Sequence, residues 1–514
     1  MSKNTPKDAR SRLARETGTV IKDWGGRLPV ALVYPNSYYI GMSNLGIHTI
    51  YKLLNDYDGI ACERVFLEQH SKGGFIPPVS LESERPFSDF SVIAFSVTYE
   101  LDYFYVVKIL KSSGVPLYAE ERDESHPLVI AGGPCITANP MPLAPFFDCL
   151  CIGEAEAILP DMLPVLREGT GEKRDNLLKS LGNLPGIYVP HINKVKPVKR
   201  QWLTDLDSFQ SHTSVLTPDT ELGNLYLVEA ERGCVHGCQF CMVSTIFSPV
   251  RYRSVNSILE QAREGLNYRR RIGLVGPSVS EHPQFKEILS GLHQYSAEIS
   301  VSSLRIRPLP ESAVSELVKG KAKTIALAPE AGSQRLRSLI KKGINEEDII
   351  QAMRKVAEYG IRQLKLYFMI GLPTETDEDV EEIAKLTFKC RETLESISPG
   401  CRITLSIAPF VPKAGTPFQR QPMEEVSVLN NRVNILKKQL SPAGISIKAD
   451  SPAWSRVQGV LARGDKRLAE VLADIENLNL SGWQKALTQK GLDERYYLRK
   501  IFHDEIVPWS MINE

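Results

Sequence analysis

Hydrophobic and polar positions along residues 28–168 form a pattern in which strands and helices follow one another. Short apolar segments rich in β-branched residues predict strands at 29–34, 91–97, 127–133 and 147–153. Between the first two, Ile47, Ile50 and Leu54 recur on one helical face. The pattern predicts a doubly wound, Rossmann-like α/β domain with a parallel sheet, whose ligands bind beyond the carboxyl ends of the strands.

A second alternating series occupies residues 223–419. Six strand-like segments, each followed by a helical stretch or loop, predict a partial (β/α)6 barrel of the TIM type with its active site at the carboxyl ends of the strands. Residues 169–222 lose the period, and we interpret them as a linker. Residues 420–514 predict a helical C-terminal region with little strand, and residues 1–27 form an N-terminal extension.

Charge and composition narrow the class of protein. The chain has 62 Lys plus Arg against 61 Asp plus Glu, so its net charge of +1 gives no global attraction to nucleic acid or to an anionic membrane. No stretch reaches the length of a membrane span, and the basic start lacks the apolar run of a secretory signal. We expect a cytoplasmic protein whose nine cysteines form no disulfide framework.

Three of those cysteines form a cluster in the segment ERGCVHGCQFC, directly after the first predicted barrel strand. Cys234, Cys238 and Cys241 follow a CxxxCxxC spacing that is improbable by chance, which disfavours ordinary packed thiols. Structural zinc needs four protein ligands, and the nearby His236 lies between two of the thiols, where chelation of the same ion would be cramped. A four-iron, four-sulfur cluster held by three thiolates would leave one iron open to another molecule.

The triplet, its place after the first barrel strand and the aromatic Phe240 before the last cysteine resemble the radical S-adenosylmethionine superfamily. The resemblance implies that Cys234, Cys238 and Cys241 hold a [4Fe-4S] cluster whose open iron binds the amino and carboxylate groups of S-adenosylmethionine. Reductive cleavage of that cofactor then yields methionine and a 5′-deoxyadenosyl radical, which abstracts hydrogen from a substrate. It further implies a low-potential electron donor of the flavodoxin or ferredoxin type.

Other barrel segments agree with this resemblance and extend the expected cofactor site. Gly276 lies where the superfamily has a Gly-rich segment near the methionine amino group, although the usual acidic residue there is missing. An arginine that points into the barrel suits the methionine carboxylate, and an acidic side chain suits the ribose hydroxyls. The further expected cofactor-binding residues are Phe240, Ser303, Arg305, Glu330 and Gly371.

The N-terminal domain resembles the cobalamin-binding domain that precedes many barrels of this superfamily. Its phrases include YPNSYYIGMSNLG and VIAGGPCITANP. Gly132 and Gly133 would let a flat macrocycle approach the backbone, and Ser96 and Thr98 could hydrogen-bond its nucleotide tail. The DxHxxG element that ligates cobalt from below is absent, because His48 lacks this context, and we expect it to be an ordinary helix residue.

The resemblance implies a radical enzyme that methylates an unactivated carbon with cobalamin, on a small-molecule or peptide substrate that the sequence does not name. The alternatives are a corrin-free enzyme, such as a methylthiotransferase or other RNA modifier, and a nonenzymatic iron-sulfur or zinc-binding scaffold. Methylthiotransferases usually carry three further cysteines in the N-terminal domain. Here only Cys135, Cys149 and Cys151 could serve, in a strand-like setting that suits a second cluster poorly, and no basic RNA-binding tail is evident.

Overall fold

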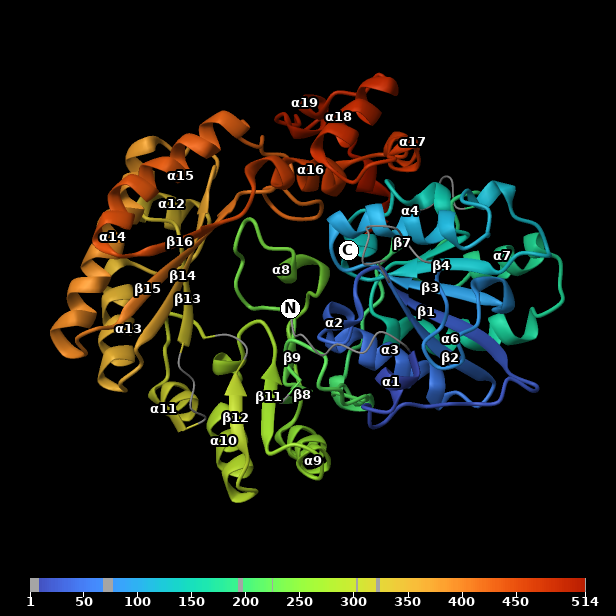
Figure 1. The fold of residues 1–514 in the computed structure, drawn as a ribbon, viewed down its shortest axis with the longest axis horizontal. Helices are drawn as coiled ribbons and strands as arrows, with labels where there is room; N and C mark the ends of the chain where they lie inside the picture. Colours follow the sequence, from blue (N-terminus) through green and yellow to red (C-terminus); the bar gives the residue numbers. More distant parts are fainter. Residues whose placement is uncertain are drawn as a thin grey trace.

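A computed structural model describes residues 9–67, 77–192, 197–223, 225–301, 304–319 and 324–513. Two α/β parts lie side by side, and helices near the C-terminus lie across the top of both in the view of Figure 1. No helix among the described residues is long and apolar enough to cross a membrane. The predicted α/β class, with a doubly wound part, a partial barrel and a helical C-terminal region, is confirmed.

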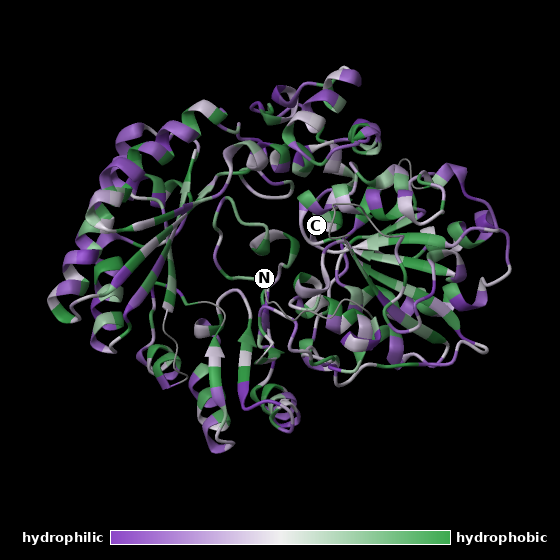
Figure 2. Cartoon of the chain, in the orientation of Figure 1, coloured by the Kyte–Doolittle hydropathy of each residue, from purple (hydrophilic) through white to green (hydrophobic). Residues whose placement is uncertain are grey.

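The N-terminal part is built on a six-stranded sheet in the order β2-β1-β3-β4-β5-β6. The strands are parallel, apart from the antiparallel last one: β1 (Leu28–Tyr34), β2 (Ile60–Phe66), β3 (Val92–Ser96), β4 (Leu128–Gly132), β5 (Cys149–Cys151) and β6 (Ile187–Tyr188). Neighbouring residues of β1 contribute to different cores, because side chains alternate across a sheet. Figure 2 shows these strands as hydrophobic along much of their length, which is typical of a sheet covered on both faces.

Helices cover both faces of this sheet. Those that share a core with Val30 and Leu32 are α3 (Leu45–Asp56), α6 (Ala155–Glu168) and α7 (Arg174–Gly182). The face of Ala31 and Val33 packs against α4 (Tyr103–Ser112) and against helices from the far end of the chain. One face of the sheet is therefore fully covered only when the C-terminal helices pack on it.

Two parts of this sheet were not predicted from the sequence. Strand β2 has Glu63 and Arg64 in its middle, which break the apolar pattern, yet every residue of the strand is buried. Arg64 is neutralised by two buried carboxylates, those of Glu16 at 2.6 Å and Glu82 at 2.7 Å. The range that we interpreted as a linker, 169–222, contains α7 and β6, so the N-terminal sheet extends beyond residue 168.

The barrel consists of two parallel sheets that are not paired with each other among the described residues. One contains β8 (Leu225–Glu229), β11 (Arg271–Val275) and β12 (Glu298–Val301); the other contains β13 (Thr324–Glu330), β14 (Gln363–Ile370), β15 (Arg402–Pro409) and β16 (Ser446–Ala449). Six of these strands are the predicted ones. The seventh, β16, pairs with β15 from within the range expected to be helical, and its exposed residues gave no alternating pattern to detect.

One continuous hydrophobic core joins the two barrel sheets to their helices. The helices are α9 (Val255–Leu266), α10 (Phe285–Gln294), α11 (Glu311–Lys319), α13 (Glu346–Glu358), α14 (Asp377–Ile397) and α15 (Val426–Leu440). Helix α12 (Gln334–Leu339) packs in a separate apolar cluster with Leu372 and Phe410. These helices lie outside the strands in Figure 1, which leaves the inner side to the loop that carries the three cysteines.

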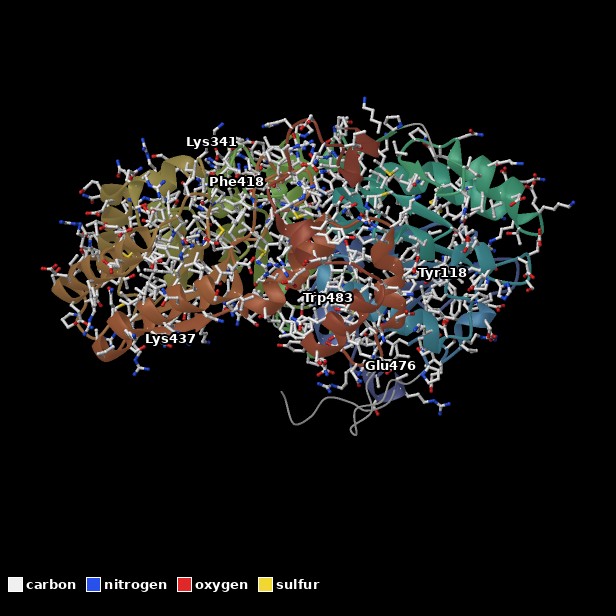
Figure 3. The ribbon with its side chains drawn as sticks, turned by 90° about the horizontal axis from the view of Figure 1, so that it is seen from above. Tyr118, Lys341, Phe418, Lys437, Glu476 and Trp483 are labelled. Atoms are coloured by element: carbon white, nitrogen blue, oxygen red, sulfur yellow. The ribbon has the colours of Figure 1, made fainter. Side chains whose placement is uncertain are left out.

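The remaining C-terminal helices pack on the N-terminal part. They are α16 (Pro452–Arg463), α17 (Arg467–Asp474), α18 (Leu480–Gln489) and α19 (Glu494–Leu498). Trp483 of α18 is 1% exposed and meets Phe104 of α4 edge-on, with 5.7 Å between the ring centroids. Figure 3 labels Trp483 where these helices lie over the N-terminal part. This region therefore completes the core on one face of the N-terminal sheet.

Candidate functional site

The three cysteines lie on a loop that leaves the first barrel strand. The loop follows β9 (Glu231–Arg232) and ends at the short helix α8 (Val243–Ile246). Gly233 has a φ of +82°, and a Cβ there would lie 2.5 Å from the carbonyl oxygen of Phe247, so the chain can turn into the loop only with glycine at this position. The Cys241 amide donates to the Cys238 carbonyl at 3.2 Å, which closes a turn between those two cysteines.

The environment of the thiols combines burial with nearby cations. Cys238 is buried, and Cys234 and Cys241 are half-buried. Burial raises the pKa of the Cys238 thiol, while the charges of Lys342 and Arg305 act to lower it. Cationic groups beside thiols favour the thiolate form that iron requires. Across the described part of the chain, no three His, Cys, Asp or Glu side chains converge as they would around a single metal ion.

The backbone of the cysteine loop is hydrogen-bonded to two barrel segments, one just after α12 and one after β15. Gln239 donates its amide to the Ile340 carbonyl at 3.1 Å, and its own carbonyl accepts the Phe418 amide at 2.9 Å. Phe240 packs against an apolar group that includes Leu372 and Phe410. These contacts hold the segment between Cys238 and Cys241 from two sides, and they give Phe240 a packing role at the site.

A carboxylate that the sequence analysis missed joins the cysteine loop to the third strand. Glu281 follows β11 and accepts a hydrogen bond from His236 at 2.7 Å, and its Oε2 lies 3.6 Å from Nε of Arg305. His236 therefore contacts a carboxylate of the loop after β11. Glu281 is five residues beyond Gly276 and was not singled out from the sequence, because no motif surrounds it.

Glu330 and Lys342 form a second ion pair beside the thiols. Glu330 ends β13 at an irregularity in the strand pairing, and its φ is +69°, an uncommon conformation for a residue with a side chain. Its Oε1 lies 3.0 Å from Nζ of Lys342, and both side chains are at most 15% exposed. Lys342 was not singled out from the sequence because it lies in a polar turn with no motif around it.

The other barrel residues expected at the cofactor site are Gly276, Gly371 and Ser303, and they do not form one group. Gly276 lies against Glu231, whose Cγ would be 2.4 Å from an added Cβ. Gly371 has a φ of +81° and donates its amide to Glu375, on the side of the strand covered by Leu429 of α15. Ser303 lies outside the described residues.

A large cavity separates the N-terminal part from the barrel. Its volume is about 750 Å³, within the usual range for cofactor sites, and most of its lining is apolar. It lies at the carboxyl ends of β1, β3 and β4, where the order of the sheet reverses and doubly wound folds bind their ligands. The four residues predicted for this domain all line it: Ser96, Thr98, Gly132 and Gly133.

The barrel contributes the opposite wall of the same cavity through residues that flank the cysteines. Gly233 and Val243 lie just before and just after the triplet, and both line the cavity. Glu231 also lines it and is 1% exposed; its Oε1 accepts from the Ser278 amide, whereas its Oε2 has no partner among the described residues. Burial raises the pKa of this carboxyl, because the charged form is disfavoured away from water.

Buried ion pairs cross the boundary beside the cavity. Arg232, two residues before the first cysteine, binds Glu154 at 2.9 Å and Glu156 at 2.6 Å, which are the N-cap residue and a first-turn residue of α6. Arg232 also pairs with Glu229 of β8 at 2.8 Å. A second arginine, Arg251, pairs with Glu154 at 2.7 Å. All five side chains are at most 13% exposed, so the N-terminal part and the cysteine loop are tied together where water is largely excluded.

His48 is a helix residue, as expected, and the fold places it in the core. It is 2% exposed, and its Nδ1 accepts the Val215 amide while Nε2 lies 3.0 Å from the Met42 carbonyl. Burial lowers its pKa to about 4, so the ring is neutral with both nitrogens engaged. No histidine is among the described residues that line the cavity.

Similarity to known sequences agrees with this architecture. Residues 46–190 match the family of radical SAM proteins, N-terminal, and residues 228–387 match the radical SAM superfamily. An uncharacterised protein of Methanocaldococcus jannaschii is 30% identical over 450 residues, which cover 86% of this chain and 90% of that protein. An uncharacterised methyltransferase of Pyrococcus horikoshii is 25% identical over 295 residues, which cover 54% of this chain and 62% of that protein.

Two solved structures share the fold. OxsB, a cobalamin-dependent S-adenosylmethionine radical enzyme solved with aqua-cobalamin and S-adenosylmethionine bound, matches with a TM-score of 0.52 at 16% identity, covering 90% of this chain and 71% of that one. TsrM from Kitasatospora setae, a radical S-adenosylmethionine methyltransferase, matches with a TM-score of 0.51 at 13% identity, covering 76% and 75%.

The chain combines a doubly wound domain with an open barrel that carries a three-cysteine loop. These features define the class of the protein as a radical enzyme with an α/β fold. The chain belongs to the radical S-adenosylmethionine superfamily and carries that superfamily's N-terminal domain.

Proposed function

We propose that this protein is a cobalamin-dependent radical S-adenosylmethionine methyltransferase that acts on an unactivated carbon of a small molecule or peptide. The observation that carries the proposal is the shared cavity. One wall is the glycine turn of the doubly wound domain, and the other is formed by residues on either side of the cysteine triplet. A methyl carrier in this cavity would lie next to the place where the substrate radical forms.

The residues around the thiols fit a cluster and S-adenosylmethionine. Cys234, Cys238 and Cys241 would hold the cluster, which when bound supplies the electron that cleaves the cofactor's sulfonium. Arg305 would bind the methionine carboxylate, Glu281 the amino group and Glu330 the ribose hydroxyls. Each of these three side chains lies at the carboxyl end of a barrel strand or in the loop that follows it, and each is already paired with an opposite charge or lies near one.

The N-terminal wall of the cavity fits a flat corrin. Gly133 has a φ of +108°, and a Cβ there would lie 2.6 Å from the Val97 carbonyl oxygen, so the backbone turns sharply at the cavity edge. Gly132 exposes its backbone to the cavity without a side chain in between. With His48 engaged in the core and no histidine among the described lining residues, a corrin bound here would have no histidine ligand from them.

The corrin-free alternative is favoured by a different observation. A tRNA-2-methylthio-N(6)-dimethylallyladenosine synthase of Aquifex aeolicus is 26% identical over 204 residues, which cover 36% of this chain. However, Cys135 and Cys149 are at most 3% exposed, and burial raises the pKa of Cys135, Cys149 and Cys151. These thiols are also fixed in regular elements, with Cys149 and Cys151 in the short strand β5, so they are poorly placed to hold a second cluster.

The test is to load the protein anaerobically with iron, sulfide and hydroxocobalamin and to measure bound iron and corrin together. We expect about four irons and about one corrin per chain. Gly132→Val should fill the cavity edge and abolish corrin uptake while iron loading persists. Full iron loading of the wild-type protein with no bound corrin would overturn the methyl-transfer proposal and leave the corrin-free enzyme.

A further inference from the structure

A second pocket, of about 370 Å³, lies on the outside of the barrel beside the cysteine loop. Its lining is polar and basic, with no acidic side chain among the described residues that form it. The lining residues are Arg307, Gln334, Arg337, Ser338, Lys341, Gly343, Ile344 and Asn345. Nothing in the proposed reaction uses this pocket.

Two of its basic side chains are open to solvent and one is buried beneath them. The Arg307 side chain is 63% exposed, and Lys341 is exposed. Arg337 is 1% exposed and donates to the carbonyls of Ala331 and Gly332, but its Nε has no partner among the described residues. The buried Arg337 guanidinium adds positive charge beneath the two exposed basic side chains.

Few neighbouring acids offset this charge. Asp348 lies 3.6 Å from Arg307, a long contact for an ion pair, and its carboxylate also caps the first turn of α13. Glu346 on the same turn is paired with Lys389 at 2.6 Å. The pocket therefore keeps an excess of positive charge at its mouth.

The pocket is also the part of the outer surface that touches the cysteine loop. The Lys341 carbonyl oxygen lies 4.0 Å from Sγ of Cys238, and the Ile340 carbonyl accepts the amide of Gln239 at 3.1 Å. Figure 3 shows Lys341 at the outer edge of the molecule, close to Phe418, which also bonds to Gln239. A single exposed residue, Lys341, therefore lies between solvent and the Cys238 thiol on this side of the loop.

We propose that this basic pocket is the docking surface for an acidic, low-potential electron carrier protein. The proposal rests on the proposed radical function, because reductive cleavage consumes one electron for each S-adenosylmethionine. The carrier loses one electron and the cluster site gains it, and no bond forms or breaks in this transfer. Electron transfer slows steeply with distance, so the carrier must dock close to the cysteines, and opposite charges steer it to this pocket.

The test compares charge-reversed variants with two electron sources, reduced flavodoxin and dithionite. For each protein we take the ratio of the 5′-deoxyadenosine formation rates with the two sources, which cancels any change in cluster content. Lys341→Glu combined with Arg307→Glu should lower the ratio and weaken flavodoxin binding, each by about tenfold at low ionic strength. Added salt should lower the wild-type ratio but hardly that of the variant.

The matched control is Lys437→Glu on α15, an exposed lysine that Figure 3 shows at the opposite edge of the barrel part. Lys437→Glu reverses one surface charge, as each substitution in the test variant does. Its ratio of 5′-deoxyadenosine formation rates and its flavodoxin affinity should both match those of the wild type. An unchanged ratio and unchanged affinity in the Lys341→Glu, Arg307→Glu variant would overturn the docking proposal. Absence of 5′-deoxyadenosine with dithionite in the wild-type protein would instead contradict the proposed radical function, while the binding measurement would still test the docking.

Discussion

At the scale of single residues, the cysteine triplet could be identified from the sequence, whereas its charged neighbours could not. Cys234, Cys238 and Cys241 are recognisable because one loop carries all three at a fixed spacing. Lys342 and Glu281 come from other loops, and only the folded chain brings them to the thiols or to the loop that carries them. A motif within one segment can be recognised in the sequence. A charged side chain that is brought close only by folding leaves no local pattern there.

The triplet should be indispensable residue by residue. In Cys238→Ala, we expect iron content to fall well below the roughly four irons of a full cluster and S-adenosylmethionine cleavage to be undetectable, because two thiolates do not retain the cluster. Iron analysis and 5′-deoxyadenosine formation measure this. Cys401→Ala, which changes a buried cysteine of the barrel core, should keep both. Wild-type iron and cleavage in Cys238→Ala would contradict the assignment of the site.

Asp102 should make stability depend on pH. Burial, with a smaller effect of Glu100, raises its pKa from an ordinary 3.8 to about 7, although the Asn36 amide donates to it at 2.8 Å. Between pH 4 and pH 7 the folded state therefore holds a proton that the unfolded chain releases. The free energy of unfolding should decrease across that window as pH rises, by up to about 4 kcal/mol, and then level off.

Denaturant titrations at several pH values check this expectation. Asp102→Asn keeps an oxygen to accept from Asn36 but cannot ionise, so its stability should lose this part of the pH dependence and exceed that of the wild type above pH 7. Parallel pH profiles for the two proteins would show that Asp102 has no raised pKa in the folded state.

At the scale of elements, the prediction succeeded where the hydrophobic pattern was regular. Strands β1, β3 and β4 lie within a few residues of the predicted segments. Strand β2 was missed because Glu63 and Arg64 read as polar, although their charges are compensated inside the protein. Strand β16 was missed because its side chains are mostly exposed, so nothing distinguishes it from a loop until it pairs with β15.

The turn between β4 and α5 (Pro134–Ala138) should tolerate no side chain at its glycine. Gly133 has φ +108° and ψ 174°, a conformation essentially restricted to glycine, and a Cβ would lie 2.6 Å from the Val97 carbonyl oxygen. Gly133→Ala should lower the free energy of unfolding by about 2–3 kcal/mol or more. Gly132→Ala is the control: its nearest contact would be 3.4 Å, and its cost should be well below that of its neighbour, as measured by urea denaturation.

At the scale of the whole molecule, the candidate site is a product of contact between distant parts. Residues from the N-terminal sheet and from both ends of the cysteine loop line one cavity, and C-terminal helices complete the core on the far face of that sheet. Domain order is readable from the sequence, but the relative placement of the domains is not. The Arg232 network is one cause of that placement, because it is buried between the two parts.

Removing Arg232 should therefore destabilise the protein strongly. Arg232→Met would leave Glu156 without this partner in a buried site, and Glu154 and Glu229 would each keep only one arginine. We expect a loss of about 3–5 kcal/mol in the free energy of unfolding, measured by chemical denaturation.

The comparison is with an exposed pair on α14. Lys385→Met breaks the pair with Glu382, whose side chains are 60% and 41% exposed, and should change stability by less than about 1 kcal/mol. Equal costs for the two variants would mean that burial of the Arg232 network adds nothing to the joining of the domains.

By itself, the sequence determined the α/β class, the order of the two parts and the three thiols, because these depend on periodicity and spacing within short segments. The tertiary structure alone decided that Glu281 and Lys342 join the site, that the cavity spans both parts, and that His48 is a core residue. Those outcomes depend on which distant segments pack together, and packing is set by the burial of the whole chain rather than by any one stretch of it.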